Sequence, residues 1–98
     1  MKKKSENKKQ QAGFAGFATF TLIGTVVDVY EGKKADYAKV RTWDDEYYRD
    51  YDVTVSKEFG VENNDVLRFD GTIRVFWDEK ISRYRYLLTA ETVEEVST

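Results

Sequence analysis

The sequence predicts an all-β fold, a single small domain that forms a five-stranded antiparallel barrel with one short helix between its third and fourth strands. The composition favours strands, because it holds seven Tyr, six Phe and two Trp, many β-branched residues and no Pro. Five segments alternate between apolar and polar residues, which is the period of a strand with one buried face. At 98 residues the chain is long enough for one domain with one modest core.

Charge divides the chain into a tail and a body. Residues 1–13 are polar and rich in Lys, and they cannot bury enough apolar area to order themselves. We therefore expect a flexible tail at 1–13 and the barrel domain at 14–98. Five Lys and one Glu give the tail a charge of +4, so the net charge of −2 leaves −6 for the body. An acidic body is not the basic footprint that is typical of strong duplex-DNA binders.

The apolar stretch at 12–27 follows a basic start, as the core of a signal peptide would. It contains three Gly and three Thr, and it continues directly into a strand pattern. The stretch is also too short and too polar to span a bilayer. We expect a cytoplasmic protein with no membrane contact.

The chain contains no Cys and no His. Disulfides, thiolate metal sites, cysteine nucleophiles and a Ser-His-Asp triad are therefore excluded, and the usual general base near neutral pH is missing. The acidic residues around 44–52 lack the Gly and the spacing of a calcium loop. We predict no enzyme, no cofactor, no metal site and no small-molecule substrate.

The five strands are separated by turns rich in Gly, Asn, Lys and acidic residues. The first and fourth strands are long and carry Gly24 and Gly71 near their middles, where a closing barrel must bend. A break in the alternation predicts a short helical turn that is capped by Ser56. The strands are expected at residues 17–30, 37–43, 47–56, 65–77 and 83–93.

The second strand carries the pattern that points to a ligand. Its even-numbered residues are small and are expected to face the core. Its odd-numbered residues alternate aromatic rings and cations, in the order Tyr37, Lys39, Arg41 and Trp43. Rings that stack on bases and cations that neutralise phosphates are what holds a single nucleic-acid strand without sequence preference.

Two segments carry a resemblance to a known family. Residues 66–75 read Val-Leu-Arg-Phe-Asp-Gly-Thr-Ile-Arg-Val, and residues 84–90 read Tyr-Arg-Tyr-Leu-Leu-Thr-Ala. With the helical turn before them, they resemble the oligonucleotide-binding barrels, and within these the single-stranded DNA-binding proteins of bacteria, phages and mobile elements. The chain departs from typical bacterial members in a short loop between strands two and three and in the lack of an acidic C-terminal tail ending in Pro-Phe.

The resemblance implies a sequence-tolerant single-stranded DNA-binding protein, working in replication or recombination of a phage or mobile element as a homo-oligomer. RNA is the other candidate ligand. In such barrels the ligand crosses strands two and three and is framed by the loops after strands one and four. The residues expected at the interface are Lys33, Lys34, Tyr37, Lys39, Arg41, Trp43, Tyr48, Arg68, Arg74, Phe76, Lys80 and Arg83.

Structural interpretations stay open beside these roles. Tyr37 and Trp43 could cover the barrel rim, Arg68 and Arg74 could be solvated partners of nearby acids, and Tyr84 and Tyr86 could pack in the core or at an edge. The alternative function is a protein-interaction or assembly barrel, in which the aromatic face forms a subunit interface.

Overall fold

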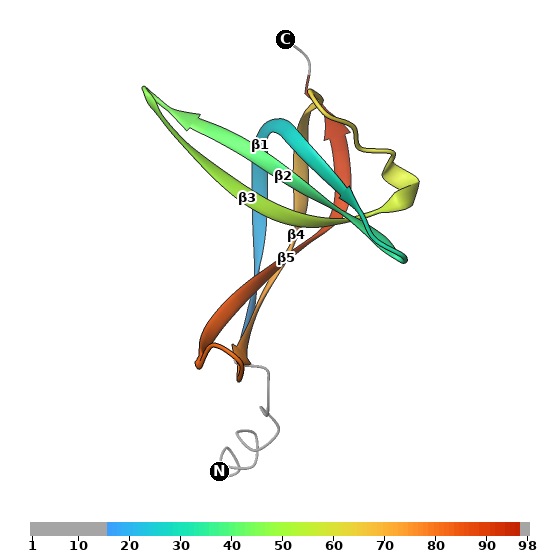
Figure 1. Ribbon diagram of the computed structural model, residues 1–98. Helices are drawn as coiled ribbons and strands as arrows, with labels where there is room; N and C mark the ends of the chain where they lie inside the picture. The colour runs from blue at the N-terminus through green and yellow to red at the C-terminus, as the bar shows by residue number, and fades with distance from the viewer. Residues whose placement is uncertain (1–15, 97–98) are drawn as a thin grey trace, which may run out of the picture.

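The computed structural model describes residues 16–96, so the predicted tail at 1–13 lies outside the described residues. Five strands and one short 3-10 helix (η1) follow one another in the predicted order, each within three residues of its expected ends (Figure 1). They are β1 Gly16–Glu31, β2 Ala35–Asp44, β3 Tyr47–Ser56, η1 Lys57–Phe59, β4 Val66–Asp78 and β5 Arg83–Glu95. No helix among the described residues is long and apolar enough to cross a membrane.

The strands form a closed barrel in the order β1-β2-β3-β5-β4. Four of the five contacts are antiparallel, but β3 and β5 are parallel, with Val53 opposite Leu88 and Thr54 opposite Thr89. The prediction of a purely antiparallel barrel is therefore wrong at this contact. The reason is geometric, because a ring with an odd number of strands cannot reverse direction at every contact.

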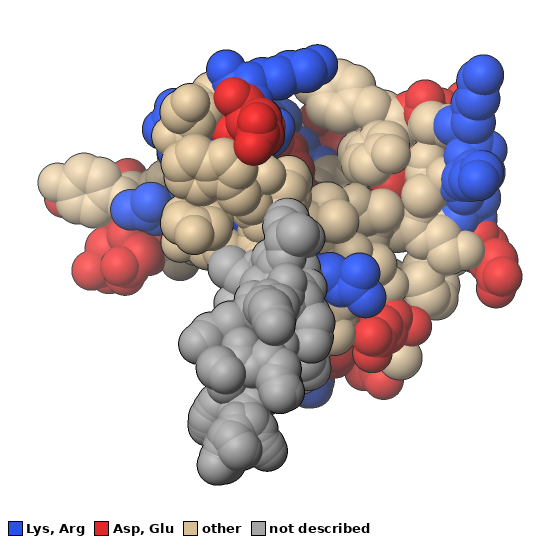
Figure 2. Space-filling model, turned by 90° about the horizontal axis from the view of Figure 1, so that it is seen from below, with Lys and Arg blue, Asp and Glu red and all other residues tan. Residues whose placement is uncertain are grey.

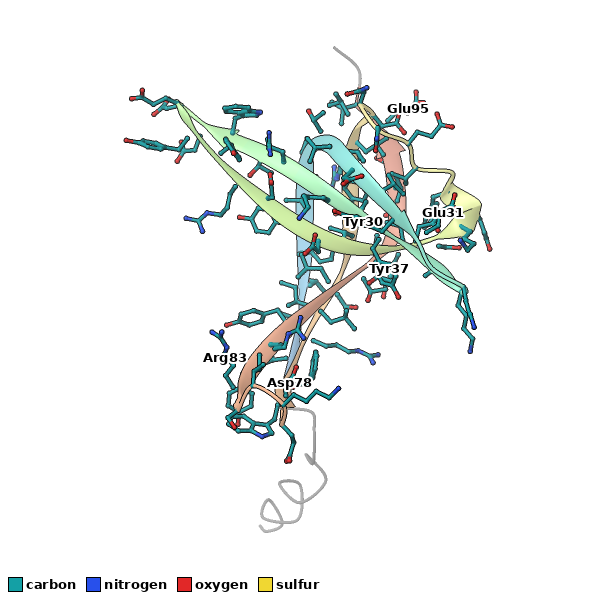
Figure 3. The ribbon with its side chains drawn as sticks, viewed as in Figure 1. Tyr30, Glu31, Tyr37, Asp78, Arg83 and Glu95 are labelled. Atoms are coloured by element: carbon teal, nitrogen blue, oxygen red, sulfur yellow. The ribbon has the colours of Figure 1, made fainter. Side chains whose placement is uncertain are left out.

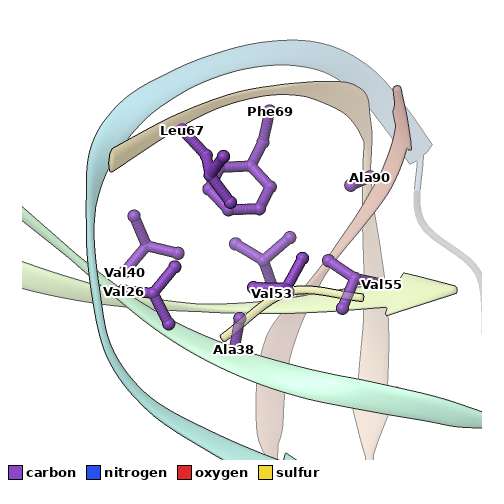
Figure 4. Close-up of a cluster of buried hydrophobic side chains, with 9 residues drawn as sticks. Val26, Ala38, Val40, Val53, Val55, Leu67, Phe69 and Ala90 are labelled. Atoms are coloured by element: carbon purple, nitrogen blue, oxygen red, sulfur yellow. The ribbon is translucent and has the colours of Figure 1, made fainter. Parts of the chain in front are cut away.

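The core consists of small aliphatic side chains packed around one aromatic ring (Figure 4). Phe69 is fully buried and is the largest of these side chains. The core uses the even positions of β2 and the odd positions of β3 and β4, as the alternation predicts. Its members are Val26, Ala38, Val40, Val53, Val55, Val61, Leu67, Phe69 and Ala90.

A short helical turn connects β3 to β4. Ser56 caps it as predicted, because its hydroxyl accepts a hydrogen bond from the backbone N–H of Glu58 at 3.3 Å. Gly60 ends the helix in the left-handed conformation, with φ 57°. Beyond it Val61 is buried, so the turn adds one side chain to the core.

At each of the two mid-strand glycines, the backbone of a neighbouring strand lies where a Cβ would be. A Cβ at Gly71 would lie 1.9 Å from the carbonyl oxygen of Thr89, and a Cβ at Gly24 would lie 2.5 Å from that of Arg41. The β4–β5 register shifts between Asp70 and Gly71, which agrees with the predicted bend there. In β1 the register shift lies between Val26 and Asp28, beyond Gly24 and where the strand already pairs with β2.

Two hairpins extend beyond the barrel. Figure 1 shows β2 and β3 projecting to one side, and β4 and β5 projecting toward the end of the molecule where β1 begins. We call residues 42–50 the β2–β3 arm and residues 73–87 the β4–β5 arm. Because β3 and β5 pair only at two positions, the arms diverge from that contact. Each arm therefore exposes both of its faces.

Candidate nucleic-acid interface

The outer face of β2 carries the residues that the alternation predicts. Ala38 and Val40 are buried, whereas Tyr37 and Trp43 are 45% and 62% exposed. The antiparallel register with β3 places Tyr48 opposite Trp43 on this face, and Tyr48 is 53% exposed. The predicted rings of strands two and three are therefore accessible to a ligand.

The two cations of this face are already paired with carboxylates. Arg41 lies opposite Asp50 and donates two hydrogen bonds to it, from Nε at 2.8 Å and from Nη2 at 3.0 Å. Lys39 lies opposite Asp52, with Nζ and Oδ1 3.5 Å apart. The hydrogen bond from Arg41 lowers the pKa of the Asp50 carboxyl group, so Asp50 stays ionised. A phosphate would have to compete with these carboxylates for both cations.

The aromatic side chains of the β2–β3 arm form an ordered pair. The ring centroids of Trp43 and Tyr48 are 5.2 Å apart, with an angle of 57° between the ring planes. The guanidinium carbon of Arg41 lies 3.9 Å from the centroid of the Tyr48 ring, within the range of a cation–π contact. The interpretation of Trp43 as a rim cover does not fit its exposure.

Tyr30 of β1 extends this aromatic surface and is absent from the predicted set. It lies opposite Tyr37 in the β1–β2 register and is 52% exposed (Figure 3). The signal for it is available in the sequence only when the short β1–β2 turn is used to align the two strands.

Arg68 lies apart from this face. It is on the outer surface of β4, and β1 lies between β4 and β2 in the barrel. Its guanidinium donates to Asp70, from Nε at 2.9 Å, and Asp70 also accepts a hydrogen bond from the Thr21 hydroxyl. The structure therefore agrees with the interpretation of Arg68 as the partner of a nearby acid.

The remaining predicted residues of strands four and five lie on the β4–β5 arm. Arg74, Lys80 and Arg83 are exposed and have no ion-pair partner among residues 16–96, and Phe76 is half-buried. Figure 3 shows Asp78 and Arg83 at the tip of the hairpin. Arg85, next to them, donates to Asp78 at 3.1 Å. This arm holds cations that are free to meet phosphates.

The other face of the β4–β5 arm carries an aromatic cluster that was not predicted as a site. Trp77 and Tyr84 lie opposite each other, with ring centroids 5.1 Å apart in an edge-to-face arrangement. Tyr84 is 57% exposed and Tyr86 is 70% exposed, so packing in the core is wrong for both, and packing at an edge stays a prediction. Within the barrel, the side of β5 that carries these residues faces the core. In the arm, which extends beyond the barrel, no other strand covers this side. The excess length of strands four and five is the signal that could have revealed this.

Lys33 and Lys34 lie in the turn between β1 and β2, and both are exposed. In Figure 1 this turn lies on the opposite side of the barrel from the tips of the two arms. The predicted cations are therefore spread over the molecule. Figure 2 views the end of the β4–β5 arm and shows Lys and Arg separated by carboxylates and uncharged side chains, without a continuous basic stripe.

Comparison with solved structures identifies the architecture. The chain superposes on the mitochondrial single-stranded DNA-binding protein Rim1 of S. cerevisiae with a TM-score of 0.66, covering 86% of this chain and 99% of that one. The chain has the oligonucleotide-binding fold. The sequence identity is only 12%, so the likeness concerns the fold. No family model matches the sequence, and no curated protein matches it.

Proposed function

We propose that this chain binds single-stranded DNA without sequence preference. The observation that carries the proposal is the pair of arms on an oligonucleotide-binding barrel, each presenting an ordered aromatic pair to solvent. Every base has a π-face, so exposed rings bind bases in a sequence-tolerant way. We propose a binding role without catalysis, which the lack of Cys and His in the sequence favours.

The rings and the cations have separate tasks in this proposal. Bases stack on Trp43 and Tyr48 of one arm, on Trp77 and Tyr84 of the other, and on Tyr37 at the start of β2. Phosphates are neutralised by the predicted cations that have no ion-pair partner among residues 16–96, which are Lys33, Lys34, Arg74, Lys80 and Arg83. Lys39 and Arg41 contribute less to phosphate binding because Asp52 and Asp50 already hold them. Arg68 is left out of the proposed path.

The biological setting follows the family resemblance. A role in replication or recombination, in the cytoplasm and in a phage or mobile element, fits the strand and turn pattern of residues 66–90. The body charge of −6 opposes binding to duplex DNA, whose two strands double the density of negative charge. Preference for single strands over duplex is therefore part of the proposal.

Fluorescence titration with oligo-dT tests the proposal directly. The two Trp residues, Trp43 and Trp77, report one arm each, and Trp43→Phe and Trp77→Phe variants separate their signals. Stacking of a base on either ring is expected to quench its fluorescence at micromolar protein and low salt. Absence of quenching in both variants would rule out the proposed ligand, and parallel titrations with oligo-U and duplex DNA decide between DNA, RNA and double strands.

We also propose a homo-oligomer, formed at the free edge of β1. Residues 18–23 pair with β4 along one edge, and along the other they have no partner strand in the described part of the chain. The sequence has no charged residue from 12 to 27, although exposed edge strands are usually protected by charge or Pro. A second copy that adds its own β1 would satisfy this edge, and the aromatic arms would remain free.

Size measurement by light scattering tests the oligomer and its location. Ile23→Lys places a charge beside the free edge, where Ile23 is 52% exposed, and is expected to give monomers. Trp43→Ala is expected to keep the wild-type size while it weakens DNA binding. If Trp43→Ala instead dissociates the oligomer, the aromatic face is the subunit interface and the assembly alternative gains support.

A further inference from the structure

Arg41 lies at the centre of a row of four side chains on the outer face of β2 and β3. Its guanidinium donates to both carboxylate oxygens of Asp50, at 2.8 and 3.0 Å. It also covers the ring of Tyr48 at 3.9 Å, and Tyr48 contacts Trp43 at a centroid distance of 5.2 Å. The row therefore runs from the carboxylate through the guanidinium to the two rings, and it alternates between the two strands.

The contacts of Arg41 leave it poorly placed to bind a phosphate. A guanidinium binds carboxylate and phosphate through the same planar fork of N–H groups, and here that fork is used by Asp50. One of its flat faces lies against Tyr48. The side chains of Arg41 and Asp50 are 29% and 25% exposed, so both are partly covered. The accessible surface of this row belongs to the rings.

We propose that Arg41 and Asp50 are positioning residues, which hold Tyr48 and through it Trp43 in the orientation that receives a base. This inference rests on the proposed function. Asp50 fixes the plane of the guanidinium with two hydrogen bonds, and the guanidinium fixes the tilt of the Tyr48 ring from one side. The rings then meet a base without first giving up rotational freedom, which favours binding.

Two other ion pairs of the chain serve as built-in comparisons. Arg68 and Asp70 form a pair of the same chemical type, at 2.9 Å, and no aromatic ring among residues 16–96 makes a cation–π contact with this guanidinium. Lys39 and Asp52 lie on the same face as Arg41, but make one contact of 3.5 Å. Only the pair at Arg41 joins a carboxylate to an aromatic ring among the described residues, so its effect on binding can be separated from that of a surface ion pair.

Replacing Asp50 distinguishes positioning from simple electrostatics because the two predict opposite signs. Asp50→Asn removes a negative charge from the DNA-binding face and frees Arg41 for phosphate. Electrostatics alone would therefore tighten binding and make it more sensitive to salt. If Asp50 positions the rings, Asp50→Asn weakens oligo-dT binding by roughly three- to tenfold, a part of the full effect of losing a stacking ring.

Replacing Arg41 tests the same inference with the charge retained or removed. Arg41→Lys keeps the charge but cannot form the planar fork, so we expect it to weaken oligo-dT binding about as much as Arg41→Met, roughly three- to tenfold. The salt dependence should stay at the wild-type slope in both variants. Arg68→Lys, the matched control, should bind within about twofold of wild type. Wild-type affinity in Arg41→Lys, or a slope shallower by about 0.7 in Arg41→Met, would identify Arg41 as a phosphate ligand and overturn the inference.

A measurement on the free protein separates this inference from the proposed function. In a Trp77→Phe background, Trp43 is the remaining tryptophan, so the tryptophan band of the near-UV circular dichroism and acrylamide quenching of indole fluorescence report Trp43. Arg41→Lys and Asp50→Asn should weaken the Trp43 dichroism band and make the indole more accessible to acrylamide, and Arg68→Lys should change neither. Unchanged spectra in the first two variants would refute positioning whether or not the protein binds DNA. A wild-type protein that binds no oligonucleotide would instead refute the proposed function.

Discussion

The salt dependence of oligo-dT binding should fall when the cations at the tip of the β4–β5 arm are removed. In the proposed function, phosphates meet five of the predicted cations that have no ion-pair partner among residues 16–96, including Lys80 and Arg83 on this arm. On a single strand each neutralised phosphate contributes about −0.7 to the slope of log K against log salt, so five contribute about −3.5. Replacing Lys80 and Arg83 by Ala should make the measured slope less steep by about 1.4, whatever the tail adds.

The assay is a set of oligo-dT titrations at four or more salt concentrations. Over a fourfold rise in salt, a slope of −3.5 corresponds to a loss of about 130-fold in affinity and a slope of −2.1 to about 20-fold. The matched control replaces Lys57 and Arg68 by Ala, which also removes two cations, but these are paired with Asp36 and Asp70. The control should keep the wild-type slope. Equal changes in both double variants would show that net charge alone governs binding, and no change in either would refute the assignment of the arm.

Three further outcomes follow from the core, the bend and the paired carboxylate. Phe69→Ala should lower the free energy of unfolding by about 3–5 kcal/mol in urea titrations, because Phe69 is the largest fully buried side chain. Gly71→Ala should cost about 3 kcal/mol by the same assay, since its Cβ would lie 1.9 Å from the Thr89 oxygen and force β4 and β5 apart. The Trp43 dichroism band should stay constant between about pH 7 and about pH 5 and weaken only at lower pH. The reason is that Arg41 lowers the pKa of Asp50, so the interaction is present above the aspartate pKa of the unfolded chain and is lost as pH falls through the lower folded value.

The order of the strands along the chain and the sides that form the core could be predicted, because both follow from the alternation of apolar and polar residues within each strand. Val40 and Val53 belong to alternating runs, and each is buried where its parity places it. The parallel β3–β5 contact could not be found in this way, since it joins residues far apart in the chain. It depends on closure of the ring, which is a property of the whole sheet and of the number of its strands.

The site was only partly predictable, because it depends on how neighbouring strands are aligned as well as on which residues of each strand face outward. Parity identified Arg41 and Trp43 as outward-facing, but the opposing Asp50 becomes visible only when β2 and β3 are aligned. The tight turn after Asp44 sets that alignment, with Asp44 opposite Tyr47, so a hairpin argument could have found the ion pair. The exposure of Tyr86 needed the structure, because the alternation does not show where a strand leaves the barrel.

The distribution of charge connects the acidic body to its proposed ligand. The β4–β5 arm has four cations and two carboxylates, whereas the β2–β3 arm has one cation and four carboxylates. In the proposed function, phosphates are drawn to the first arm, and the second can approach the strand only through its rings. A single strand can turn the faces of its bases toward Trp43 and Tyr48, whereas a duplex keeps these faces stacked inside and carries its phosphates outside, where the carboxylates of the arm repel them. The acidic charge, which argues against a duplex binder, thus becomes a physical reason for selecting single strands.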